Sequence, residues 1–368
     1  IIANRANEIM GGGKGTYEHV HPNNHVNMGQ SSNDVIPTAI RLTTLTLLDR
    51  LYPELEKLIT AFKKIAMYGK GVIKVGRSHL QDAVPMTVEQ EFGAFAHTLQ
   101  KTLDQIKKLS EVLLEVGVGG TAIGTGITTS PRFKPQFVRL LADISGYPLR
   151  QATDTVELTS NVNAFSLVSA GLRQLAIDYT KIANDLKLLA MGPIAGIGEI
   201  TLPEVEPGSS IMPGKVNPSI PESVHMAAYQ VFGNDHAIAL AAQAGQLQLN
   251  VMTPLILFNL AFSLQLLTNT TIMFRTFCVD GIIINNERIT QLFEESLCTA
   301  TALSPYLGYH ETAALVQEAL KKRKTIKSIV LEKSLLTEAE LNKIMDPERT
   351  TKPALLDQSI LKKLKNKK

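Results

Sequence analysis

Long stretches of helical periodicity constrain this chain more than any other feature of its sequence. Between Val35 and about Met67, apolar residues recur at three- and four-residue intervals. Pro37 falls in the first turn of this stretch, where its missing N–H costs little. Similar stretches cover residues 87–115, 153–190, 221–244 and 254–277, whereas strand-like alternation is scarce. The pattern predicts an all-α fold, an extended bundle of long helices.

Several of these stretches are apolar on more than one face, which predicts burial on nearly all sides. The clearest examples are "VSAGLRQLAI" (168–177) and "HAIALAAQAGQLQLNVM" (236–252). One bundle of 368 residues would have difficulty covering them all, so we expect a homo-oligomer; the alternative is one thick monomeric bundle. The 44% hydrophobic content suffices for a large core, although the chain has no tryptophan.

Charge and cysteine content exclude several classes of protein. A net charge of +3 is too small to indicate nucleic-acid binding, and the basic ending "LKKLKNKK" is typical of a solvated tail. Cys278 and Cys298 lack metal-site spacing and indicate a reducing compartment, so we predict a cytoplasmic protein. No uninterrupted apolar run reaches membrane-spanning length. Because the chain begins "IIANRANEIM", we expect that residues precede it.

Four loops, at 21–34, 75–85, 116–131 and 207–218, contain most of the residues suited to chemistry. The loop "GSSIMPGKVNP" (208–218) superficially resembles a phosphate-binding loop, but five residues separate its glycines and Val216 follows the lysine. A "GxSxG" nucleophile elbow is also missing. We therefore expect Ser209 to act as a base near Lys215 and the backbone amides, while Lys215 and Asn217 hold a carboxylate.

The other loops offer three further candidate sites. "SSND" (31–34) is a helix N-cap, but Ser31, Ser32 and Asn33 together supply more groups than one cap requires, so they could bind a carboxylate. His21 and His25 have i,i+4 spacing, yet Pro22 argues against a helix and no third metal ligand is evident. We expect no metal, and a weaker second anion site at His21 and Asn24.

Two other motifs contain glycine or histidine residues that could serve a functional site. "GVGGTAIGTG" (117–126) contains the form G-x-G-x-x-A, but without the strand-turn-helix context of a dinucleotide site. His79, beside Ser78, could have a purely structural role, as most lone histidines do. Alternatively, a nearby carboxylate such as Glu222 would let His79 take part in proton transfer. We expect no cofactor.

With these motifs in view, the chain resembles the aspartase/fumarase superfamily along almost its whole length. The segments that carry the resemblance are "HPNNHVNMGQSSNDVIPTA", "GRSHLQDAVPMTVEQEF", "GGTAIGTG", "KIANDLKLL", "GSSIMPGKVNP" and "GQLQLNVM", in the family's order. The resemblance implies helical homotetramers whose active sites combine loops of three subunits. It implies a lyase that cleaves a C–N or C–O bond of a small dicarboxylate by anti-elimination, releasing fumarate.

The resemblance also implies a role for individual residues. Ser209 would be the general base, and Lys215 and Asn217 would hold the substrate carboxylate together with Ser31, Ser32 and Asn33. Ser78 and His79 correspond to a substrate-binding Thr-His pair, and Glu222 corresponds to a glutamate that pairs with this histidine. By the same resemblance, we predict a remnant of an N-terminal domain at 1–32, a central helix bundle at 33–287 and a small C-terminal helical domain with a basic tail at 288–368.

Within the superfamily, the motifs divide between two reactions. "LQDAVPM", "LLEVGVGGTAIGTG" and "GQLQLNVM" resemble the branch that removes ammonia from aspartate, whereas "QSSND" and "HVNM" resemble class II fumarases. We predict the ammonia-lyase reaction, with fumarate hydration as the alternative, followed by other lyases of the superfamily and a non-catalytic structural member. One departure is Ile194 in "GPIAG", where an arginine is usual.

Overall fold

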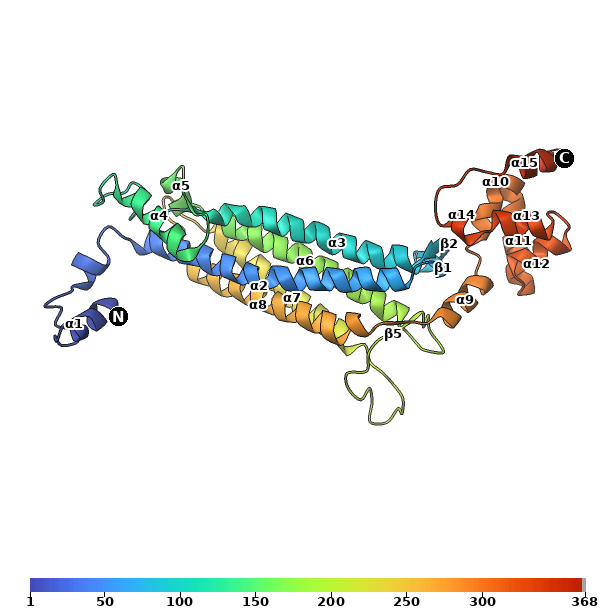
Figure 1. The fold of residues 1–368 in the computed structure, drawn as a ribbon, viewed down its shortest axis with the longest axis horizontal. Helices are drawn as coiled ribbons and strands as arrows, with labels where there is room; N and C mark the ends of the chain where they lie inside the picture. Colours follow the sequence, from blue (N-terminus) through green and yellow to red (C-terminus); the bar gives the residue numbers. More distant parts are fainter. Residues whose placement is uncertain (366–368) are drawn as a thin grey trace. The chain divides into compact units, whose positions relative to one another are not determined.

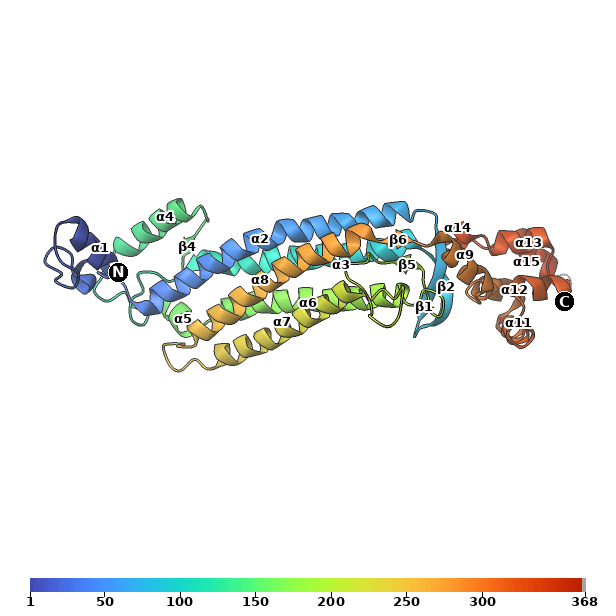
Figure 2. The ribbon, with the colours of Figure 1, turned by 90° about the horizontal axis from the view of Figure 1, so that it is seen from below.

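The computed structural model describes residues 1–365 and confirms the all-α prediction, since 64% of the chain is helical. Five long helices lie side by side in Figures 1 and 2: α2 (Ser32–Tyr68), α3 (Val88–Ser110), α6 (Asn163–Leu189), α7 (Ser219–Gln243) and α8 (Thr253–Phe277). The chain divides into two compact units, and each of these helices contributes residues to both. The first unit comprises Ile1–Lys57, Leu99–Ala183 and Glu222–Met273; the second comprises Leu58–Thr98, Asn184–Pro221 and Phe274–Lys368.

In the first unit, the long helices bury an aliphatic core. Leu51, Leu103, Leu172 and Leu264 are fully buried. Shorter elements complete this unit: α1 (Ile2–Ile9), the π-helix η1 (Pro22–Val26), the 3₁₀ helix η2 (Glu111–Leu114), α4 (Phe133–Ser145), α5 (Thr155–Ser160), and strands β3 (Glu115–Val116) and β4 (Arg150–Gln151), which pair in parallel.

The helix predicted over 153–190 is broken in two, which corrects the sequence interpretation. Asn161 ends α5 with extended backbone angles (φ −119°, ψ 133°). Its side-chain oxygen accepts a hydrogen bond from the N–H of Asn163, the first residue of α6, at 2.9 Å. Asparagine therefore starts a new helix here, because its short side chain competes with the backbone for hydrogen bonds.

Residues 75–85 form a hairpin in the second unit, so the prediction of an irregular loop there was wrong. Strand β1 (Ile73–Ser78) pairs antiparallel with β2 (Gln81–Thr87), and the register shifts between Val75 and Arg77. A Cβ at Gly76 would lie 2.5 Å from the carbonyl oxygen of Val84, so the bulge requires glycine. Buried Lys74 in place of an apolar residue conceals the alternation that marks a strand.

Small helices make up the rest of the second unit and include a hydrophobic cluster of their own, centred on Leu303, Ile329, Val330 and Leu341. Strands β5 (Ile200–Thr201) and β6 (Ile283–Ile284) pair antiparallel. The helices are η3 (Val279–Gly281), α9 (Asn286–Glu295), η4 (Ala300–Leu303), α10 (Ser304–Leu307), α11 (Tyr309–Lys322), α12 (Ile326–Glu332), α13 (Glu338–Ile344), α14 (Pro347–Thr350) and α15 (Gln358–Lys365).

The domain boundaries at 32/33 and 287/288 stay predictions. The last three residues of the basic tail, 366–368, lie outside the described residues.

Within residues 1–365, one helical segment, Thr253–Gly281, is long and apolar enough to span a membrane by length and composition, with a mean hydropathy of 1.4. Polar residues such as Asn259, Ser263 and Gln265 interrupt its apolar run. Of the most apolar window, 44% is buried inside the chain. The core helix of a soluble protein passes the same test, so this feature is weak evidence for a membrane.

Candidate active site

The signature loop 208–218 brings its chemical groups together through its own backbone. The Oγ atom of Ser209 accepts hydrogen bonds from the N–H groups of Ile211 and Met212, both at 3.2 Å. Asn217 donates its Nδ2 to the carbonyl oxygen of Gly208 at 2.8 Å and so closes the loop. Two N–H donors on one hydroxyl oxygen favour its ionised form, which is what a serine base requires.

Glycine is essential where the two ends of this loop meet. A Cβ at Gly208 would lie 1.8 Å from the carbonyl oxygen of Lys215, so no other residue fits. The Lys215 side chain is exposed and has no ion pair among residues 1–365. Pro213–Pro218 also line a cavity of about 940 Å³, together with Lys187 and the segment 190–193.

Ser78 and His79 lie at the exposed tip of the β1–β2 hairpin. Ser78 pairs with Gln81, so the turn consists of His79 and Leu80 only. Both have left-handed backbone angles, with φ of 54° and 60°, as in the turns that usually contain Asn and Gly. Non-glycine residues in this region cost roughly 1–2 kcal/mol each, so the rest of the hairpin must hold the turn in place.

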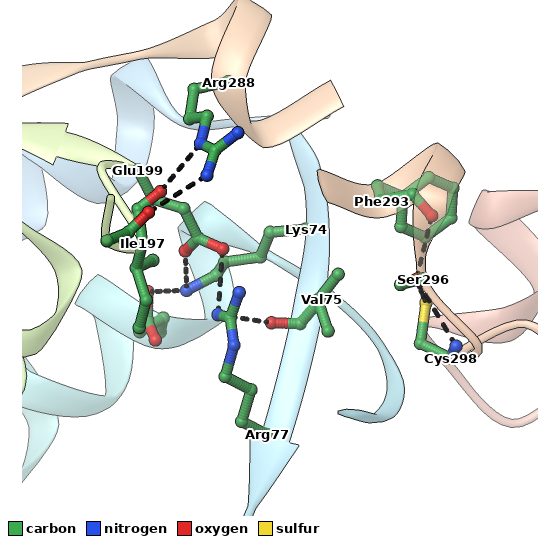
Figure 3. Close-up of polar contacts among 11 residues, drawn as sticks. Lys74, Val75, Arg77, Ile197, Glu199, Arg288, Phe293, Ser296 and Cys298 are labelled. Carbon is green, nitrogen blue, oxygen red and sulfur yellow. Dashed lines mark hydrogen bonds and ion pairs between the residues drawn. The ribbon is translucent and has the colours of Figure 1, made fainter. Parts of the chain in front are cut away.

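A buried ionic network at the base of the hairpin supplies this support (Figure 3). Glu199, with 1% of its surface exposed, accepts a hydrogen bond from Arg77 at 2.8 Å and forms an ion pair with Lys74 at 2.7 Å. Lys74 also contacts Glu91 at 2.6 Å. Burial raises the pKa of Glu91, while the neighbouring Lys74 lowers it by a smaller amount. Removing one partner of such a group leaves an uncompensated buried charge, which typically costs about 3–5 kcal/mol.

The same part of the second unit shows what supports the loop that contains Ile194. Arg288 of α9 donates Nε to the carbonyl oxygen of Ile197 at 3.1 Å and Nη2 to that of Gly196 at 3.0 Å (Figure 3). Ile194 itself is 88% exposed. A cation therefore holds this loop although its own sequence contains isoleucine where the family usually has arginine.

In the first unit, Ser31, Ser32 and Asn33 form the N-terminal end of α2. Ser31 Oγ accepts the N–H of Asn33 at 3.1 Å, which confirms that the motif caps the helix. Asn33 Nδ2 donates to the carbonyl oxygen of Ala122 at 2.7 Å. The N-terminus of a helix attracts anions, so this arrangement is compatible with carboxylate binding beyond the cap.

Asp34 fixes this end of α2 to the glycine-rich loop at 116–131, a role that the sequence analysis did not predict. Its Oδ2 accepts the N–H groups of Gly119 at 3.0 Å and Thr121 at 2.8 Å, and its Oδ1 accepts that of Ser31 at 3.0 Å. The carboxylate is buried, with 2% of the residue exposed. The only signal in the sequence was its place within "SSND", where a cap explains an aspartate equally well.

His21 and Asn24 lie at the π-helix η1 (Pro22–Val26), so the argument from Pro22 against a helix there was wrong. Pro22 takes the first position, where a missing N–H costs little. His21 Nδ1 caps the helix by accepting the N–H groups of Asn23 and Asn24 at 3.1 and 3.2 Å. Among residues 1–365, no group of three or more His, Cys, Asp or Glu side chains could hold a metal ion. The second anion site stays a prediction.

The predicted site residues are divided between the two units: Ser31, Ser32, Asn33 and Glu222 belong to the first, and Ser78, His79, Ser209, Lys215 and Asn217 to the second. Within residues 1–365, no hydrogen bond joins His79 to Ser209 or Lys215, although all three belong to the second unit. Glu222 lies exposed in the first turn of α7. Its pairing with His79 stays a prediction, as does the catalytic role of each residue.

The fold and the signature loop define a class of protein, and the comparisons establish which one. Residues 1–233 match the family model described as lyase, and residues 300–352 match the model described as fumarase C C-terminus. The chain belongs to the aspartase/fumarase superfamily of lyases, which confirms the resemblance found in its motifs.

Individual relatives are similar over nearly the whole chain. The aspartate ammonia-lyase of Bacillus subtilis is 46% identical over 99% of this chain and 76% of its own. A crystal structure of "fumarate lyase:delta crystallin" from Brucella melitensis bound to cobalt superimposes with a TM-score of 0.92, at 45% identity, over 96% of this chain and 76% of its own. The crystal structure of a class II fumarase from Schistosoma mansoni superimposes with a TM-score of 0.91, at 36% identity, over 96% of this chain and 77% of its own.

Proposed function

We propose that this chain is an aspartate ammonia-lyase, which converts L-aspartate reversibly to fumarate and ammonia. The observation that carries the proposal is the geometry of Ser209, whose oxygen faces two backbone N–H donors inside the signature loop. Curated relatives named aspartate ammonia-lyase, 42–50% identical over most of this chain, support the choice of substrate.

In the proposed reaction, Ser209 removes a proton from Cβ of the substrate. The electron pair moves into the adjacent carboxylate, which becomes a doubly charged aci-carboxylate. Lys215, Asn217 and the N-terminal end of α2 stabilise this charge, because preorganised donors act most strongly where charge develops. The pair then returns to form the Cα–Cβ double bond while the C–N bond breaks and ammonia leaves. His79, with Ser78, contacts the substrate, and Glu222 orients His79.

Class II fumarase is the second candidate, supported by "QSSND" and by the similar fold of the Schistosoma mansoni enzyme. The residues that donate hydrogen bonds to the substrate carboxylate suit malate as well as aspartate. Discrimination between the two substrates must therefore occur at the leaving group. An ammonium needs acceptors, such as the Asn33 amide oxygen and a neutral His79, whereas a hydroxyl is expelled more readily with an acid or water. An ammonium desolvated without acceptors is strongly penalised.

The proposal includes a homotetramer with active sites shared between three subunits. Large apolar side chains on the long helices support it. Phe258 of α8 and Met226 and Tyr229 of α7 are 67%, 65% and 57% exposed in the single chain. Large exposed apolar side chains, where they form a continuous patch, mark protein interfaces. Sharing between subunits would bring the predicted site residues together in one active site. A cytoplasmic location stays a prediction, supported by Cys278 and Cys298, both buried and free.

An absorbance assay for fumarate tests the proposal directly. We expect release of fumarate and an equal amount of ammonia from L-aspartate, and a rate with L-malate that is lower by at least about a hundredfold. The Ser209→Ala variant should retain its fold and lose activity by about 10²–10⁴-fold or more. Efficient dehydration of malate without ammonia would select the fumarase, and near-normal turnover by Ser209→Ala would refute the base.

A further inference from the structure

A second cavity, of about 260 Å³, lies among the small helices of the second unit. We call it the C-terminal pocket. Its walls come from η4, α10, the ends of α13 and α14, the segment 352–356 and, on one side, Val84 and Pro85 of β2. It shares no lining residue with the cavity beside the signature loop. The catalytic proposal above therefore gives it no role.

The lining of the C-terminal pocket is basic and contains no carboxylate. Lys343, Arg349 and Lys352 all contribute to it. Asp357, which does not line the cavity, pairs with Lys343 at 2.5 Å and offsets one of these charges. Arg349 donates Nη2 only to a neutral carbonyl, that of Leu355, at 2.7 Å. Within the described chain, neither Arg349 nor Lys352 has an ion pair, so two positive charges remain uncompensated.

Apolar side chains also line the pocket. Val84, Pro85 and Ile344 contribute hydrocarbon surface, and the hydroxyl-bearing residues Thr301 and Tyr306 add polar groups. Pockets of this composition bind small molecules whose skeleton is apolar and whose polar end meets a few placed charges. Arginine is suited to carboxylate and phosphate oxygens because its planar fork donates two parallel hydrogen bonds.

The pocket is also connected to the hairpin that carries His79. Pro85 pairs with Val75 in the hairpin, on the same strands as the turn. Asp82, two residues beyond that turn, accepts the N–H of Leu297 at 3.3 Å. Gln90 donates to the carbonyl oxygen of Thr351, next to Lys352, at 2.8 Å. A molecule in the pocket would press directly on the element whose strained turn positions His79.

We propose that the C-terminal pocket is a regulatory site for a small organic anion, bound through Arg349 and Lys352, whose occupancy changes substrate binding through the β1–β2 hairpin. The anionic group is a carboxylate or a phosphate. The apolar lining residues favour a ligand with a short hydrocarbon skeleton. The second part of this inference rests on the proposed lyase function, whereas the binding itself does not.

Calorimetric titration of the full chain tests binding without any assay of activity. The probes are butyrate, which has a carboxylate and an apolar tail, and inorganic phosphate, which has only the charge. We expect butyrate to bind at one site per chain more tightly than phosphate. The Arg349→Gln/Lys352→Gln variant should bind butyrate about tenfold more weakly or worse, because charge-assisted hydrogen bonds are lost. Tighter binding of phosphate would identify a phosphate site instead and overturn the proposed role of the apolar lining residues.

A matched control removes two positive charges elsewhere. Lys321 and Lys362 are exposed and do not line the pocket, so Lys321→Gln/Lys362→Gln should bind butyrate like the wild type. Equal affinity in the pocket variant and the wild type would overturn the site. If the double variant folds poorly, Lys352→Gln alone, at an exposed side chain, provides the same comparison.

Steady-state kinetics then test the connection to the hairpin. Butyrate should change the KM for L-aspartate in the wild type and in the charge control, but not in the pocket variant. Binding with no change in KM in any protein would support the site and overturn its regulatory role. Failure of the aspartate assay itself would refute the proposed function and leave the calorimetric result standing.

Discussion

Asp34 connects two segments that are 85 residues or more apart in the sequence, the N-terminal end of α2 and the glycine-rich loop. Each oxygen of its carboxylate is occupied by backbone N–H donors: Ser31 on one side, Gly119 and Thr121 on the other. Hydrogen bonds to an ionised acceptor are about twice as strong as neutral ones. Asp34 therefore positions Ser31, Ser32 and Asn33 and need not touch the substrate.

We expect Asp34→Asn to raise the KM for L-aspartate about tenfold or more while kcat changes less. The amide would turn a donor towards N–H groups, at a cost of about 1–3 kcal/mol, and shift the carboxylate-binding residues. Steady-state kinetics measure this effect. Asp154→Asn is the control, because Asp154 accepts two backbone N–H groups, at 2.8 and 3.0 Å, but they belong to α5, which it caps. Similar changes in both variants would reduce the role of Asp34 to general stability.

At the scale of elements, the β1–β2 hairpin is the feature that the sequence pattern concealed. Its two-residue turn uses His79 and Leu80 in a conformation that favours glycine. The histidine is explained by the proposed chemistry. Leu80 is 69% exposed, so burial within its own chain does not explain why a leucine stands there.

We predict that Leu80→Gly stabilises the folded chain by about 0.5–1 kcal/mol, because glycine removes the strain of the left-handed conformation. Chemical denaturation measures the free energy of unfolding. Leu140→Gly provides the comparison, since Leu140 is half exposed within α4, where glycine should destabilise by about 1 kcal/mol. A loss of stability in Leu80→Gly would instead indicate that this leucine packs against another subunit.

Glu340 in helix α13 makes the stability of the C-terminal helices depend on pH. Hydrogen bonding to Lys363 and to the N–H of Thr337 in a capping box lowers the pKa of Glu340 from 4.5 to about 2. A carboxylate with a lowered pKa binds fewer protons in the folded state than in the unfolded state. Its contribution is complete above pH 4.5 and is lost as pH falls through about 2.

The Glu340→Gln variant isolates this contribution. We expect it to have a lower melting temperature than the wild type at pH 6, and the difference should shrink between pH 4.5 and 2. Thermal unfolding of both proteins across this range provides the measurement. A difference that stays constant with pH would show that the lost capping box matters and the charge does not.

At the scale of the whole molecule, α7 and α8 expose large apolar residues such as Phe258, Met226 and Tyr229 in the single chain. Under the proposed tetramer, other copies cover them and complete each active site. Mixing Ser209→Ala with His79→Ala, followed by unfolding and refolding together, should therefore restore part of the activity. Each variant refolded alone is the control and should remain inactive. Monomers in light scattering at micromolar concentration would refute both the assembly and the shared site.

The sequence by itself determined the long helices, their approximate ends and the superfamily. Helical periodicity is a local property, so the spacing of apolar residues sufficed to predict α2, α7 and α8 to within three residues at each end. The signature loop was equally accessible, because its glycines, prolines and polar residues follow one another along the chain.

Only the tertiary structure decided the features that depend on partners distant in sequence. In the sequence, Lys74 and Arg77 interrupt the strand pattern. In the structure, both pair with Glu199, more than a hundred residues later. The sequence alone explains Asp34 as a helix cap. In the structure, Asp34 also accepts hydrogen bonds from the N–H groups of Gly119 and Thr121. A buried charge is stable only beside its partner, and sequence spacing contains no information about where that partner lies.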